Sequence, residues 1–141
     1  MTLKATAIGA LIPHAGAMCL LDEVVSWTEE EIVCSATNHR AADHPLREDD
    51  RLPAVCGVEY AGQAMAVHGA LVLQRAVGAG FLAGVRELKL HVDRLDNIGP
   101  TLIIEARRLL GGNEGMVYEF KLRDAGKLLI SGRATVALRP D

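Results

Sequence analysis

The stretch VCGVEYAGQAMAVHGALVLQRAV, residues 55–77, decides the fold class. Its residues are apolar on nearly every side of a helical wheel, which predicts a helix buried within protein on most faces. Glu59, Gln63 and His68 interrupt the run and argue against a membrane-spanning helix. The GAG sequence at 78–80 predicts the end of the helix.

Segments on both sides of this helix have the pattern of strands separated by turn sequences. They are residues 18–27 and 31–38 before the helix, and 81–92, 101–110, 115–124 and 127–138 after it. An antiparallel sheet of about six strands that wraps around one long central helix accounts for this order. We therefore expect an α+β fold and a single domain over residues 1–141. The open side of the sheet would still need covering, and a dimer is the simplest solution.

Composition excludes several classes of protein. Net charge is −3, from 15 basic and 18 acidic residues, so the basic surface of a nucleic-acid-binding protein is not expected. The cysteines, Cys19, Cys34 and Cys56, are odd in number and lack metal-ligand spacing, which favours a reduced, cytoplasmic location. Pro13 and His14 break the short apolar run near the N-terminus, so we do not expect a cleaved signal peptide.

Glu59 and Gln63 are the polar residues near the start of the helix. They are four positions apart and therefore share a helix face. Burial of an unpaired carboxylate is costly, so its presence in a core helix indicates a function. The alternative is that Glu59 only stabilises the first turn through the helix dipole.

The loop before the helix, residues 39–54, carries His44 and is stiffened by proline at both ends. The amides of Ala54, Val55 and Cys56 begin the helix, and we expect them to be unpaired and to form an oxyanion site. A histidine, a carboxylate and free amides together suit proton abstraction next to a carbonyl. His39 is the competing base.

A metal site in this loop is the weaker interpretation. His39, Asp43 and His44 are suitable ligand types, but their spacing matches no strong metal-binding pattern.

The residues around His44 resemble a known family. The segments DHPLREDDRLPAVCGVEYAGQA (43–64) and LIPHAGAMCLLDEV (11–24) resemble hotdog-fold 3-hydroxyacyl-acyl-carrier-protein dehydratases of the FabA/FabZ type. They are most similar to the ApeP-like branch, which is associated with aryl polyene synthesis. Two departures are Pro45, where the family has phenylalanine, and Ala54, where it has glycine.

The resemblance implies dehydration of a 3-hydroxyacyl thioester on acyl carrier protein to the trans-2-enoyl thioester, in fatty-acid or polyene-type chain synthesis. His44 would take the α-proton, and the amides of Val55 and Ala54 would bind the thioester oxygen. Glu59 would help the hydroxyl leave as water, positioned by Gln63. No metal or diffusible cofactor would be needed, and the substrate would be carried on the phosphopantetheine of acyl carrier protein.

The resemblance also implies that histidine and acid meet across the interface of a homodimer. The sequence does not decide whether the protein forms a larger assembly or a heterodimer with a paralogue. Two other functions stay open as well. One is an acyl thioesterase of the same fold, in which Glu59 activates water. The other is a non-catalytic subunit that binds acyl carrier protein within a heteromeric dehydratase.

Overall fold

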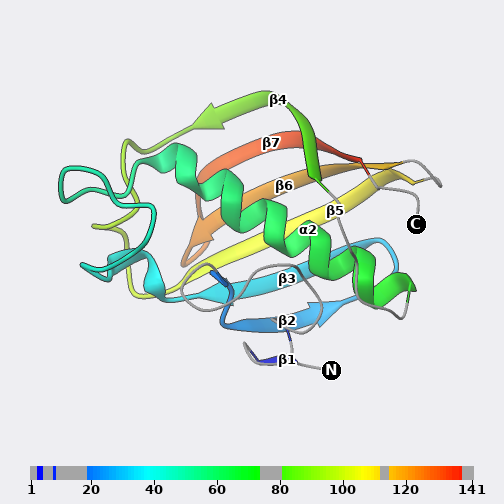
Figure 1. The fold of residues 1–141 in the computed structure, drawn as a ribbon, viewed down its shortest axis with the longest axis horizontal. Coiled ribbons are helices and arrows are strands. Elements are labelled where there is room, and N and C mark those ends of the chain that lie inside the picture. Colours follow the sequence, from blue (N-terminus) through cyan, green and yellow to red (C-terminus); the bar gives the residue numbers. More distant parts are fainter. Residues whose placement is uncertain (1–2, 5–7, 9–18, 74–80, 112–114, 138–141) are drawn as a thin grey trace.

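One long helix lies across a curved antiparallel sheet in the computed structural model, which describes residues 3–4, 8, 19–73, 81–111 and 115–137 (Figure 1). Helix α2 (Gly57–Leu73) has 17 residues and packs against the middle of the sheet. The expected α+β arrangement of a sheet wrapped around a central helix is confirmed.

The sheet has the strand order β1-β2-β3-β5-β6-β7-β4, and all neighbouring strands are antiparallel. The strands are β1 (Leu3–Lys4), β2 (Glu23–Trp27), β3 (Glu31–Ala36), β4 (Phe81–Leu90), β5 (Leu102–Gly111), β6 (Gly115–Asp124) and β7 (Lys127–Ala137). The six predicted strands are all present, and the two-residue β1 is added at one edge.

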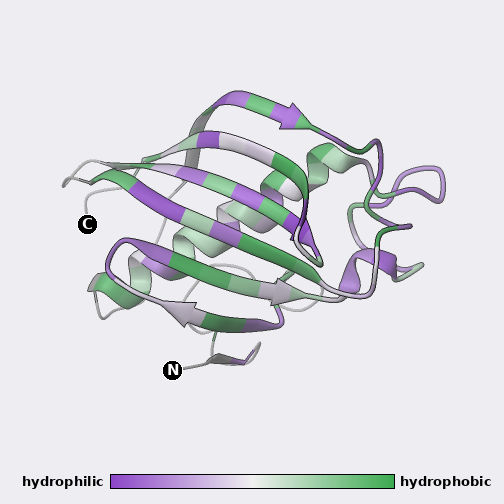
Figure 2. Ribbon diagram, turned by 180° about the vertical axis from the view of Figure 1, so that it is seen from behind, coloured by the Kyte–Doolittle hydropathy of each residue, from purple (hydrophilic) through white to green (hydrophobic). Residues whose placement is uncertain are grey.

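The core lies between α2 and the concave face of the sheet. Strand β6 alternates strictly, with Met116, Tyr118, Phe120 and Leu122 buried and the residues between them partly exposed. Figure 2 shows the sheet from behind, with hydrophilic and hydrophobic residues following one another along the strands. This period-2 pattern places one face of the sheet against α2 and the other toward solvent.

The helix begins in two steps. The 3₁₀ turn η3 (Ala54–Cys56) comes first, and α2 follows from Gly57. A Cβ on Gly57 would overlap the side chain of Ile130 and lie 3.0 Å from Leu122 Cδ2, so glycine allows this close approach to the sheet without displacing either side chain. The predicted helix end at 78–80 lies outside the described residues.

Strand β4 forms the edge of the sheet opposite β1 and pairs only with β7 among the described strands. Most of its described side chains are exposed, including Leu88 and Leu90. Within the described residues, the structure has no helix of the length and hydropathy that a bilayer crossing needs.

Candidate active site

His44 lies in the loop that follows the 3₁₀ turn η2 (Asn38–Arg40), and only 5% of it is exposed. Its Nδ1 accepts a 3.1 Å hydrogen bond from the Leu46 amide. Its Nε2 lies 2.9 Å from the hydroxyl of Tyr60, which in turn donates to Asn38 Oδ1 at 2.7 Å. Because Nδ1 is an acceptor, the neutral ring carries its proton on Nε2 and donates it to Tyr60.

The charge state of His44 is set mainly by burial. Burial lowers the pKa of His44, the nearby positive charge of Arg47 and the neighbouring His39 lower it further, and Asp43 acts in the opposite direction. The imidazole is therefore neutral near neutral pH, as a proton acceptor must be.

The helix start offers fewer free amides than the sequence predicted. The amide of Ala54 donates to the Asp93 carbonyl at 3.0 Å, and that of Cys56 donates to the Pro53 carbonyl at 3.0 Å. Two of the three expected donors are therefore used within the chain, and the expectation that the amides of Ala54 and Cys56 are unpaired is wrong. The Val55 amide has no hydrogen-bond partner among the described residues, and Val55 itself is 52% exposed. It is the available donor for an oxyanion.

Pairing with a distant segment explains the loss of the Ala54 donor. Residues 52–54 run antiparallel to residues 93–95, with a bridge between Pro53 and Arg94 and a 2.8 Å bond from the Leu95 amide to the Leu52 carbonyl. The Asp96 carboxylate accepts the Leu52 amide at 2.9 Å and pairs with Arg94, which holds the pKa of Asp96 well below its usual range. This segment fixes the position of the helix start.

Glu59 and Gln63 differ in environment although they are one turn apart. Glu59 is exposed in the single chain, which corrects the expectation of a buried carboxylate. Gln63 is buried, and its Oε1 accepts a 2.8 Å hydrogen bond from the Leu20 amide. The helix face with Val55 and Glu59 is thus turned away from the core, whereas Gln63 points into it.

Comparison with known proteins shows the family and agrees with the fold. The family model for ApeP-like proteins, described as ApeP dehydratase, matches residues 6–141. The chain belongs to the ApeP-like dehydratase family. No curated protein matches it significantly.

Solved structures show the same hotdog fold. The dehydratase heterocomplex ApeI:P from Xenorhabdus doucetiae aligns with a TM-score of 0.82 and 24% identity, covering 95% of this chain and 91% of that one. The PaaI protein of E. coli aligns with a TM-score of 0.64 and 15% identity, covering 94% and 88%. A thioesterase of Haemophilus influenzae aligns with a TM-score of 0.61 and 16% identity, covering 83% and 77%.

Two other histidines of this ApeP-like chain, His39 and His68, are buried and hydrogen-bonded within the fold. His39 is fully buried, and its Nε2–H donates to the Gly99 carbonyl at 2.7 Å. His68 is also fully buried; its Nε2–H donates to the Thr28 carbonyl at 2.8 Å and its Nδ1 accepts from the Tyr118 hydroxyl at 2.6 Å. His39 is therefore enclosed where a substrate could not reach it, which weakens it as a competing base.

Sequence reasoning missed Tyr60 and Asn38. A tyrosine in a buried helix needs a partner for its hydroxyl, which is the signal that could have drawn attention to Tyr60. No local pattern connects it to Asn38, which is 22 residues earlier.

In the part of the chain that the structure describes, no three His, Cys, Asp or Glu side chains gather as metal ligands, so His39, Asp43 and His44 do not form a ligand set.

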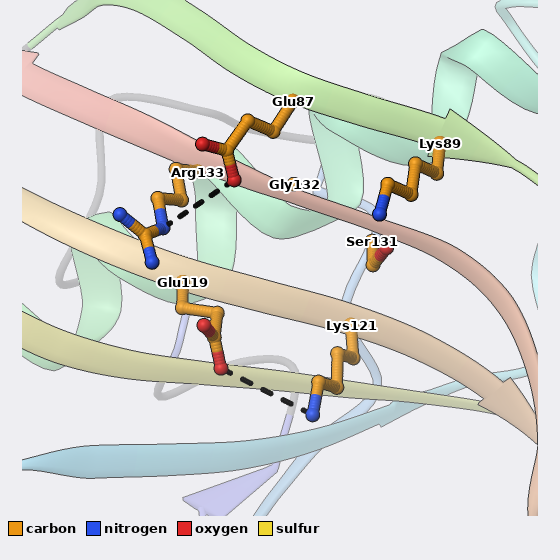
Figure 3. Close-up of a pocket in the computed structure, with 7 residues that line it drawn as sticks. All are labelled: Glu87, Lys89, Glu119, Lys121, Ser131, Gly132 and Arg133. Carbon is orange, nitrogen blue, oxygen red and sulfur yellow. Dashed lines mark ion pairs between the residues drawn. The ribbon is translucent and has the colours of Figure 1, made fainter.

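An open groove of about 180 Å³ lies away from this site, on the face of the sheet turned away from α2 (Figure 3). It is lined by residues of β4, β6 and β7, namely Glu87, Lys89, Glu119, Lys121, Ser131, Gly132 and Arg133.

Proposed function

We propose that this ApeP-like dehydratase converts a 3-hydroxyacyl thioester, carried on acyl carrier protein, to the trans-2-enoyl thioester. Family membership over residues 6–141 supports dehydration as the reaction type. The observation that carries the substrate class is the unpaired Val55 amide beside the exposed Glu59 on the outer face of the helix start. An amide donor and a carboxyl group one turn apart suit a thioester carbonyl and the hydroxyl beyond it.

Each group has one task in the proposed reaction. The thioester oxygen accepts from the Val55 amide, and neutral His44 takes the α-proton. The C–O bond at the 3-position then breaks, and the carboxyl group of Glu59 gives its proton to the departing oxygen, forming water. The positive His44 and negative Glu59 return to their starting states by proton exchange through solvent. This route needs no metal or diffusible cofactor, and the role of Gln63 toward the substrate stays a prediction.

A second chain completes the proposed site. Val55 and Glu59 face away from their own core, so a water-poor channel requires a partner to cover them. The edge strand β4, with exposed Leu88 and Leu90, offers further surface for such a contact. We propose a cytoplasmic homodimer; the heterocomplex described for the ApeI:P structure makes a dimer with a paralogue the alternative.

The test is a spectrophotometric assay of purified protein on 3-hydroxyacyl and 2-enoyl thioesters of several lengths. Glu59→Gln and His44→Ala should each lower turnover by about 10² to 10⁴. Near-normal turnover by both variants would refute the assignment of these residues. Activity that appears only after a paralogue is added would favour the non-catalytic subunit instead.

Mixing the two variants tests whether the site is shared. If His44 and Glu59 meet across a homodimer, a mixed dimer holds one site with both native residues. Subunit exchange between the two inactive variants should then restore about one quarter of the native activity, because about half of the dimers are mixed. Lack of restoration, with exchange verified, would place both residues of a site in one chain.

One observation favours an acyl thioesterase as the second candidate. Both ring nitrogens of His44 are engaged within the chain, whereas Glu59 is exposed and could activate water by itself. Release of free thiol from an acyl thioester without any change in enoyl absorbance would support this activity over dehydration.

A further inference from the structure

Tyr60 and His44 form a buried pair, and neither the family match nor the proposed reaction gives Tyr60 a role. The Tyr60 hydroxyl accepts the Nε2–H of His44 at 2.9 Å and donates its own hydrogen bond to Asn38 Oδ1 at 2.7 Å. Tyr60 is fully buried, and His44 is almost so. Tyr60 follows Glu59 directly in α2, so the two side chains lie on different sides of the helix start. Tyr60 points inward and Glu59 points outward.

The direction of these bonds decides which ring nitrogen is basic. The Leu46 amide points at Nδ1 at 3.1 Å, so that nitrogen holds the lone pair and Nε2 holds the proton. A catalytic imidazole commonly has one nitrogen held by an orienting acceptor while the other exchanges the proton. Tyr60 occupies the place of the orienting acceptor, and Asn38 fixes the direction of its hydroxyl.

We infer that Tyr60 is a positioning residue, supported by Asn38, that holds His44 in the Nε2–H form and makes Nδ1 the nitrogen that takes the proton. The catalytic role of Tyr60 rests on the proposed dehydration. The hydrogen bond between Tyr60 and His44 does not depend on that function.

The proton balance is simple. When the α-proton reaches Nδ1, the Leu46 amide gives up its bond and the ring becomes an imidazolium with its Nε2–H still donated to Tyr60. A hydrogen bond to a charged donor is stronger than one to a neutral donor, so Tyr60 favours the protonated ring. Tyr60 itself keeps its proton, because burial raises its pKa. The charged or titratable neighbours that also act on the ring are Arg47, His39 and Asp43, and Tyr60→Phe leaves all three in place.

The chain contains a matched control. His68 and Tyr118 form a second buried histidine–tyrosine pair, joined by a 2.6 Å hydrogen bond, on the sheet side of α2. Tyr60→Phe and Tyr118→Phe therefore remove the same atom from two similar environments. Each variant leaves one buried ring nitrogen without its partner, Nε2–H of His44 in Tyr60→Phe and Nδ1 of His68 in Tyr118→Phe. A general effect of losing a buried tyrosine hydroxyl should therefore appear in both variants, whereas an effect on His44 should appear only in Tyr60→Phe.

Nuclear magnetic resonance of the ¹⁵N-labelled imidazoles tests the pairing without substrate. In the native protein at about pH 8, where a histidine with an ordinary or lowered pKa is neutral, we expect His44 as the Nε2–H form. In Tyr60→Phe its titration should move to lower pH by about 0.5 to 1 unit, and in Tyr118→Phe it should not move. A native His44 with its proton on Nδ1, or an unchanged titration in Tyr60→Phe, would overturn the inference.

The catalytic arm uses the same variants. Tyr60→Phe should lower kcat about tenfold with little change in KM, and should move the acid limb of the rate profile in the direction of the His44 titration. A retained kcat and acid limb in an active Tyr60→Phe enzyme would overturn the role in the reaction. If the native protein has no dehydratase activity, the proposed function fails while the resonance experiment still decides the pairing.

Discussion

The Leu20 amide donates a 2.8 Å hydrogen bond to Oε1 of Gln63, joining the segment before β2 to the middle of α2 across 43 positions of sequence. Both residues are buried. The amide side chain that sequence reasoning assigned to substrate is thus also a tether between two parts of the fold. The segment it holds leads into β2, at the side of the sheet nearest β1.

Loss of that tether should be visible in stability. Gln63→Met keeps the length of the side chain but removes the acceptor, leaving the buried Leu20 amide without its partner. We expect the free energy of unfolding to fall by about 1–3 kcal/mol. Urea denaturation measures this. An unchanged midpoint would show that the bond to Leu20 is dispensable.

Two glycines of α2 should respond to alanine in opposite directions. Gly57→Ala would drive a Cβ into the side chains of Ile130 and Leu122 and should cost about 1–3 kcal/mol. A Cβ on Gly62 would meet nothing within 4 Å in the chain. Gly62→Ala should therefore raise the free energy of unfolding by up to about 1 kcal/mol through helix propensity. Parallel urea titrations measure both changes. Equal effects of the two substitutions would mean that the close approach at Gly57 does not limit the packing.

Acid should destabilise the protein through its buried histidines. Burial is the first cause that lowers the pKa of His39, His44 and His68. Below about pH 6.5 the unfolded chain binds protons that the folded chain does not. The contribution of these histidines to the free energy of unfolding is therefore fully present above about pH 6.5. It is lost as the pH falls from about 6.5 toward the lowered pKa values that the histidines have in the folded state.

Unfolding by urea at about pH 7.5 and about pH 5.5 would measure this loss. His68→Gln should reduce it, because the amide can still donate to Thr28 but does not titrate in this range. His91→Gln is the control, since His91 is exposed. The same pH dependence in His68→Gln as in the native protein would exclude His68 as a source.

Periodicity and spacing predicted much of the fold. The nearly all-apolar run at 55–77 predicted the central helix, and alternation predicted the six longer strands of the sheet. Both signals are local repeats that a chain must show when it buries one face of a strand or most faces of a helix. The histidine loop and the acid at the helix start were also named from sequence, and their roles in catalysis stay predictions.

Only the tertiary structure decided how those groups are used. The Ala54 amide is taken by Asp93, and His44 is held by Tyr60, because segments far apart in sequence meet at the helix start. Glu59 is exposed although its helix neighbour Tyr60 is buried, because the sheet covers only one side of α2. Local patterns specify which residues repeat along an element, but a hydrogen bond between elements depends on where two backbones cross, and that is set by the packing of the whole chain.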